Sequence, residues 1–265
     1  MIFEGKDGQK IKAAEIKLSY RKFVRNNRNY IKLTYRKSRG ILDMIEIIST
    51  HDRFSLKKIN FRIKKDDEEL GGIMRVCILF GSLRSSSNTG LLLEPFVEKL
   101  KEQGAEIDYI TLKDKHIEPC TACWTCQNIF EKPGCPKDDD MNIIYEAVLN
   151  SDCIIFATPI YSWYCTPPMK AAMDRLVYGM NKYYGDSKGP CLWEVKKCAL
   201  VTTCGYEIED GAGVFEEGLR RYSKHSNLEY IGKLAVRDID GKKYFQSKST
   251  VEAARRFAEK VFRSL

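Results

Sequence analysis

The sequence predicts an α/β protein built on a doubly wound, five-stranded parallel sheet, preceded by a small β-rich N-terminal domain. From residue 73 onward, apolar runs of strand length alternate with segments of helical periodicity, as in a parallel sheet with helices on both faces. Before it, short segments alternate apolar and polar residues at the strand period of two. The acidic, then glycine-rich stretch 66–72 separates the two patterns, so we expect domains at 1–72 and 73–265.

The N-terminal domain is expected to hold strands at 29–36 and 60–64, whereas 41–48 is ambiguous. It carries 18 basic residues (Lys and Arg) against 10 acidic ones (Asp and Glu). The rest of the chain carries 26 basic and 26 acidic residues. A basic segment can attract nucleic acid or an acidic partner. Strands with solvated outer faces collect the same residues, and we favour this interpretation, so no nucleic-acid partner is expected.

The second domain is expected to alternate five strands with five helices. Apolar runs predict strands near 74–80, 106–112, 152–158, 198–204 and 229–237. The intervening segments predict helices near 89–103, 139–150, 167–181, 211–225 and 249–263. Asp138, Asp139 and Asp140 stand where a helix N-terminus favours acids. Pro95 falls inside the first helix and is expected to kink it or displace its start.

Length and composition are those of an ordinary globular protein, with 43% apolar and 30% charged residues, so a core needs no disulfide. The first residues lack the apolar stretch of a secretion signal, and no apolar run approaches the length of a membrane span. We therefore expect a cytoplasmic protein with no membrane partner, whose ten cysteines are free thiols or metal ligands.

The strand at 74–80 runs directly into a hydroxyl-rich loop, Gly81 to Thr89, which a helix follows. A glycine lets the backbone turn sharply, and the unpaired N–H groups of a helix N-terminus favour an anion, most naturally a phosphate. Arg84 adds a permanently charged, planar donor. The spacing fits neither GxxxxGK[ST] nor GxGxxG. The alternative is a polar turn that only caps the helix.

A second loop follows the strand at 152–158. It begins with Pro159, continues through Tyr161 and Trp163, and leads into a helix with the pattern K-x-x-x-D-R. Together the two loops resemble the fingerprints of the NAD(P)H-dependent FMN reductases and iron–sulfur flavoproteins, G-S-x-R-x-x-S-N/T followed by [ST]-P-x-Y. The resemblance covers roughly 75–265 and implies a flavodoxin-like fold.

The resemblance also implies which residues contact the cofactor FMN. For its phosphate they are Ser82, Arg84, Ser87, Asn88 and Thr89. For its ring they are Pro159, Ile160, Tyr161, Ser162 and Trp163, with Cys204 and Gly205, after the fourth strand, closing the other side.

A cysteine cluster follows the second predicted strand, with Cys120, Cys123, Cys126 and Cys135 as candidate metal ligands. Three thiolates at a spacing of three can wrap one small iron–sulfur cluster, and a 4Fe-4S cluster takes four. Relatives with and without a cluster share this frame, so it leaves both alternatives open. The eight-residue final gap is longer than cluster-bearing relatives usually show, which favours free thiols. Zinc sites more often join two separated cysteine pairs.

The function implied is that of an FMN-dependent oxidoreductase that takes hydride from NAD(P)H and passes electrons to an unidentified acceptor. The flavin carries the reactive atom, so no catalytic side chain is assigned. Two alternatives remain, an iron–sulfur flavoprotein or a flavodoxin-like electron carrier between protein partners. Relatives are commonly oligomers, so a homo-oligomer is expected.

Overall fold

The computed structural model describes residues 73–193, 195–239 and 241–265, together with five strands within the first 72 residues. The chain divides into two units, Met1–Gly72 and Ile73–Leu265. In the first unit, two strands pair antiparallel and three form an antiparallel sheet in the order β3-β4-β5. They are β1 (Ile2–Glu4), β2 (Lys10–Lys12), β3 (Lys17–Arg25), β4 (Arg28–Arg36) and β5 (Ile41–Ser49). The strand expected at 60–64 lies outside the described residues.

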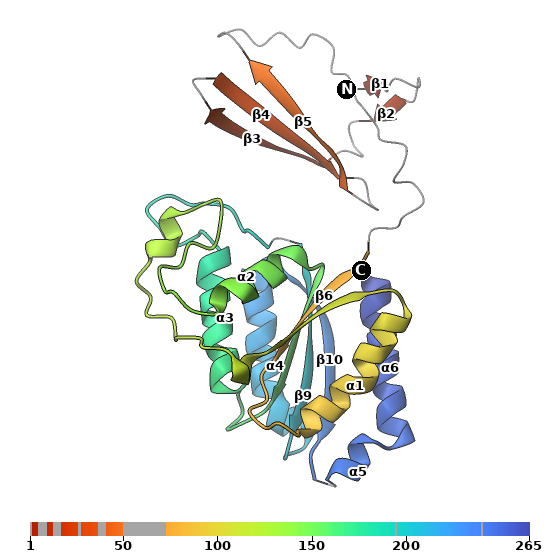
Figure 1. Ribbon diagram of the computed structural model, residues 1–265. Helices are drawn as coiled ribbons and strands as arrows, with labels where there is room; N and C mark the ends of the chain where they lie inside the picture. The colour runs from red at the N-terminus through yellow and green to blue at the C-terminus, as the bar shows by residue number, and fades with distance from the viewer. Residues whose placement is uncertain are drawn as a thin grey trace. The chain divides into compact units, whose positions relative to one another are not determined.

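The second unit is a parallel five-stranded sheet with helices on both faces (Figure 1), which confirms the predicted fold. The strands are β6 (Arg75–Phe80), β7 (Glu106–Thr111), β8 (Cys153–Pro159), β9 (Lys197–Cys204) and β10 (Glu229–Arg237). Their order in the sheet is β10-β9-β8-β6-β7. The order reverses between β6 and β8, and ligands of such sheets bind at the carboxyl ends of the strands beside that reversal.

Six helices connect these strands or follow them in the described part of this unit. They are α1 (Asn88–Glu102), α2 (Met141–Asn150), α3 (Pro167–Met180), α4 (Ile208–His225), α5 (Lys242–Phe245) and α6 (Lys248–Ser264). The single turn α5 was not expected from the sequence. Two 3₁₀ turns, η3 (Leu112–Asp114) and η4 (Thr125–Asn128), lie in the long connection from β7 to α2.

Two local expectations need correction. Helix α1 runs through Pro95 and begins at Asn88, so the expected displacement of its start is wrong; the Ser87 side chain caps it instead. At α2 the expected acids are present, but the N-cap residue Asp140 makes no capping bond through its side chain. The Asp139 carboxylate accepts the Met141 N–H (3.1 Å), because Asp140 instead accepts the N–H of His116.

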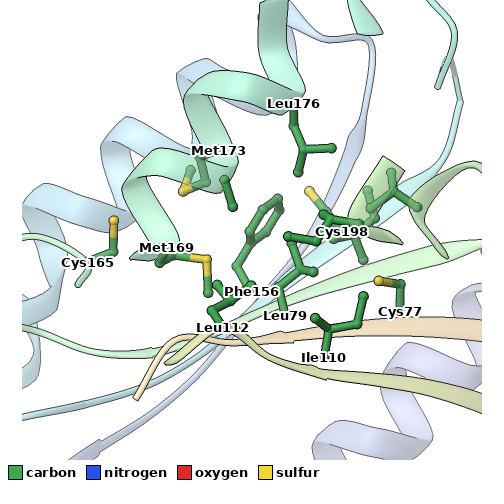
Figure 2. Packing of buried hydrophobic residues seen from close by; sticks show 14 of the residues in the cluster. Cys77, Leu79, Ile110, Leu112, Phe156, Cys165, Met169, Met173, Leu176 and Cys198 are labelled. Carbon is green, nitrogen blue, oxygen red and sulfur yellow. The ribbon is translucent and has the colours of Figure 1, made fainter. Parts of the chain in front are cut away.

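The hydrophobic core lies on both faces of the sheet. On one face, Phe156 of β8 packs among Met169, Met173 and Leu176 of α3 (Figure 2). Burying a side chain of this size contributes about 1.5–3 kcal/mol relative to its exposure. The strand cysteines Cys77, Cys153 and Cys198 are fully buried, as core residues should be. No helix in the described part of the chain is both long and apolar enough to cross a membrane.

Candidate functional site

Hydrogen bonds join the loops at the carboxyl edge of the sheet. The Gly81 N–H donates to the Ala157 carbonyl (2.7 Å), and Thr166 Oγ1, at the start of α3, donates to the Gly81 carbonyl (2.6 Å). A Cβ at position 81 would lie 2.9 Å from that Thr166 hydroxyl oxygen, so the close approach requires glycine. The Ile160 N–H donates to the Thr203 carbonyl (2.8 Å). The loops after β6, β8 and β9 are therefore fixed to one another.

In the hydroxyl-rich loop, several side-chain hydroxyls form hydrogen bonds that hold the loop in shape. Buried Ser82 accepts the backbone N–H of Arg84 (3.3 Å), and Ser87 accepts that of Gly90 (3.0 Å). Buried Thr89 shares a hydrogen bond with the Thr203 hydroxyl (2.8 Å). All three lie in the loop before α1 or in its first turn, and the prediction that they contact a phosphate stays a prediction.

The segment after β10 also contacts this loop, which sequence reasoning missed. Asn88 Nδ2 donates to the Asp238 carboxylate (2.7 Å), and Lys242 Nζ donates to Ser86 Oγ (2.9 Å). Arg84 is exposed, and its guanidinium forms no ion pair with a described carboxylate. No local pattern signals these contacts, because the partners lie 150 or more residues apart in sequence.

The aromatic loop after β8 is a tight turn, in which Tyr161 and Tyr164 exchange backbone hydrogen bonds of 2.8 and 3.0 Å. Ser162 and Trp163 between them have φ angles of 48° and 66°, a left-handed conformation that non-glycine residues adopt at a cost. The Trp163 ring stacks on Tyr206, with centroids 5.8 Å apart and planes 14° apart. Because Trp163 is 48% exposed and Tyr206 60% exposed, neither ring is a core residue.

The loop after β9 supplies the Tyr206 ring and an open backbone. A Cβ at Gly205 would meet nothing within 4 Å, so there is space against this backbone. Cys204 is buried, and its carbonyl accepts the N–H of Asp238 (2.7 Å). The Gly205 backbone is therefore open to an approaching ring, next to the stacked side chains of Trp163 and Tyr206.

All four candidate metal ligands line one small pocket of about 20 Å³, enough for roughly one water molecule. Cys126 is buried and Cys123 exposed, so the sulfurs span the pocket from interior to rim. Burial raises the pKa of the Cys126 thiol, whereas a hydrogen bond from Thr125 lowers that of Cys123. Among the described residues, no three His, Cys, Asp or Glu side chains are arranged to hold a single metal ion.

Two buried cations flank this cysteine pocket. Arg175 donates two hydrogen bonds to the Asp139 carboxylate (2.7 and 3.0 Å) and one to the Glu118 carbonyl (3.0 Å), but its Nε is buried without a partner. Fully buried Lys182 donates to the carbonyls of Cys126 and Pro133, both at 2.9 Å. No carboxylate of a described residue lies within ion-pair distance of Lys182.

These contacts set the electrostatics of the pocket. Burial would raise the pKa of Asp139, but hydrogen bonds from Arg175 and from backbone N–H groups hold it below its ordinary value. Burial lowers the pKa of Lys182, and the nearby Cys126 and Cys135 oppose this shift. Asp139 pairs with Arg175, whereas Lys182 forms no ion pair with a described carboxylate.

A doubly wound parallel sheet with two linked loops at its carboxyl edge defines the class, a flavodoxin-like α/β protein. The sequence model of the family described as NADPH-dependent FMN reductase matches residues 74–216, more than half of the chain. The chain therefore belongs to the NADPH-dependent FMN reductase family.

Individual relatives agree with this assignment. An iron-sulfur flavoprotein of Methanocaldococcus jannaschii is 34% identical over 102 residues, 38% of this chain and 51% of that protein. An NADPH:quinone oxidoreductase of Arabidopsis thaliana is 27% identical over 171 residues, 61% of this chain and 72% of that protein. The chain spans about half the length of the first relatives it matches. The solved structure of an NAD(P)H:quinone oxidoreductase from Methanothermobacter marburgensis shares the fold, with a TM-score of 0.57 and 21% identity over 72% of this chain and 98% of that one.

Proposed function

We propose that this chain is an FMN-dependent oxidoreductase that takes hydride from NAD(P)H and passes the electrons to an acceptor still to be identified. The observation that carries the proposal is the union of a hydroxyl-rich loop and an exposed aromatic loop at one edge of the sheet. Family membership supports it, as do the names of the relatives, which include an NADPH:quinone oxidoreductase.

The residues of both loops fit FMN. The N-terminus of α1, with exposed Arg84, suits a phosphate. The open backbone at Gly205 and the turn from Pro159 to Trp163 suit the two sides of a flat ring. Bound FMN supplies the hydride-accepting chemistry, and the protein orients it and excludes water. Ser82, Ser87 and Thr89 keep the loop rigid through their own hydrogen bonds, so the site is preorganised.

Cofactor identity tests this proposal directly. Heat release from the purified protein, followed by chromatography, should yield FMN, because the loop offers one compact phosphate site. The reconstituted protein should then oxidise NADPH or NADH in the presence of a quinone or ferric acceptor. Recovery of FAD, or no flavin after reconstitution, would contradict the proposal. Fast reduction by ferredoxin with slow reduction by both nicotinamides would instead indicate an electron carrier.

A second candidate function, an iron–sulfur flavoprotein, is favoured by the buried charges beside the cysteine pocket. Four neutral thiols would leave Lys182 without an ion-pair partner among the described residues, with Glu131 the carboxylate that acts on it from farther away, whereas a thiolate-ligated cluster is negatively charged. The partnerless Nε of Arg175 lines the same pocket. This charge balance opposes the preference for free thiols that the long final gap suggested. Cys120, Cys123, Cys126 and Cys135, which line this pocket, would hold the cluster.

Iron analysis of anaerobically purified protein decides this second candidate. With a 4Fe-4S cluster we expect about four iron and four sulfide per chain. Cys126→Ala should lose both while FMN stays bound, because the flavin loops belong to other connections. The buried strand variant Cys198→Ala is the matched control and should keep its iron. Iron-free protein after anaerobic reconstitution would establish free thiols instead.

We further propose that residues 73–265 form the flavin-binding domain by themselves. The described core clusters consist of residues from 74 onward. Removal of residues 1–72 should therefore leave a cooperatively unfolding protein that binds FMN, measured by circular dichroism and flavin titration. An insoluble or flavin-free product would place the boundary elsewhere. A homo-oligomer in the cytoplasm, with a nicotinamide nucleotide as its partner, completes the proposal.

A further inference from the structure

The segment from Asp238 to Lys242 is tied to the proposed phosphate site at two points. Asp238 accepts the side chain of Asn88 (2.7 Å), and Lys242 donates to Ser86 (2.9 Å). Asp238 is also fixed to the loop after β9 through the carbonyl of Cys204 (2.7 Å). Asp238 and Lys242 are therefore each held by a hydrogen bond to the connection that follows β6.

The backbone of this segment directs Lys242 toward the loop. Gly241 has a φ angle of 69°, in the left-handed region that favours glycine, and the turn α5 begins directly after it. The hydrogen bond from Lys242 to Ser86 joins residues 156 positions apart in sequence. Lys242 follows β10, and Ser86 follows β6. Figure 1 shows α5 beside the start of α1.

The ammonium group of Lys242 has a charge not paired with a described carboxylate and N–H donors still available for a ligand. Its hydrogen-bond partner Ser86 offers a neutral hydroxyl, and Lys242 forms no ion pair with a described carboxylate. An ammonium has three N–H donors, so two remain available. Arg84, on the same loop, is likewise exposed and unpaired. Among the described residues, the carboxylate that contacts this loop, Asp238, is already held by Asn88.

We propose that Lys242 is a further binding residue for the FMN phosphate, acting together with Arg84. A phosphate monoester carries about −1.5 to −2 charges at pH 7, so two cations balance it better than Arg84 alone. This inference rests on the proposed function, because it assumes that the loop holds FMN. On this proposal, residues from both the connection after β6 and the connection after β10 form the phosphate site.

Riboflavin, which lacks the phosphate, provides the test. In Lys242→Met, the Kd for FMN should rise roughly three- to tenfold at low salt, as expected for an exposed charge pair with one charge-assisted hydrogen bond. The Kd for riboflavin should not change. Lys243→Met is the matched control, since it removes the same charge from the next residue of α5, which has no hydrogen bond to a described residue.

Other outcomes would contradict either this inference or the proposed function, and they can be told apart. Equal losses in Lys242→Met and Lys243→Met, or an equal loss for riboflavin, would overturn the inference in favour of a general charge or structural effect. An unchanged Kd for FMN together with a higher KM for NADPH but not for NADH would assign Lys242 to the nucleotide phosphate instead, and would also overturn it. Wild-type protein that binds no FMN would remove the proposed function itself.

Discussion

We expect Arg84→Ala to weaken FMN binding roughly ten- to a hundredfold, because a charge-assisted hydrogen bond contributes about 1.5–3 kcal/mol. The guanidinium is exposed and unpaired among the described residues, so no internal ion pair is lost with it. The backbone N–H of Arg84, which donates to Ser82, is retained in the variant. The loop should therefore keep its shape, and the loss should report the contact to phosphate.

Equilibrium titration by flavin fluorescence measures this effect. Arg221→Ala is the control, since it removes another exposed arginine, whose contact is an i,i+4 pair with Glu217 on α4. Rising salt should reduce the difference between Arg84→Ala and wild type, as screening weakens an exposed charge contact. A Kd equal to that of wild type would mean that Arg84 points away from the flavin and that the loop has been misread.

The second large effect concerns stability. Arg175→Met should lower the free energy of unfolding by about 3–5 kcal/mol, because it leaves the buried Asp139 carboxylate without its cation. Only 2% of the Arg175 side chain and none of the Asp139 side chain is exposed. The same control, Arg221→Ala, breaks a pair whose side chains are 80% and 57% exposed, and should cost no more than about 1 kcal/mol.

Chemical denaturation measures this difference in the free energy of unfolding, with wild type and variants at the same cofactor content. The double variant with Asp139→Asn should be less destabilised than the sum of the single variants, since the uncompensated charge is gone. The lowered pKa of Asp139 predicts the pH dependence. Its contribution is present above the ordinary carboxyl pKa of 3.8 and is lost as the pH falls through the still lower folded value. Arg175→Met within 1 kcal/mol of wild type would show that the pair is dispensable.

The sequence predicted what depends on local periodicity and on strand ends. All five strands of the second unit were expected within one or two residues, because fully buried parallel strands such as β8 are continuous apolar runs. The two loops proposed to bind flavin were predicted for a related reason. Each follows a strand directly, and parallel strands bring their carboxyl ends to one edge.

Contacts between distant segments could not be read in the same way. Asp139 looked like a capping acid, and only the fold shows that its carboxylate also binds Arg175, on another helix. Lys242 had no motif around it, and its partner Ser86 belongs to the first connection of the sheet. Pro95 was expected to disturb α1, yet the helix continues, since tertiary packing buries that proline. Propensity is a weak prior where packing decides.

Helix α3 sets the distance between the aromatic loop and the cysteine pocket. Its first turn follows the aromatic loop at Thr166, and Arg175, nine residues later, already lines the cysteine pocket. At 1.5 Å per residue, the two ends of this interval are about 14 Å apart. A helix of this length holds the backbones of Thr166 and Arg175 at a fixed separation. Electrons passing between a flavin at the aromatic loop and a cluster in the cysteine pocket would have to bridge the spacing that this helix sets.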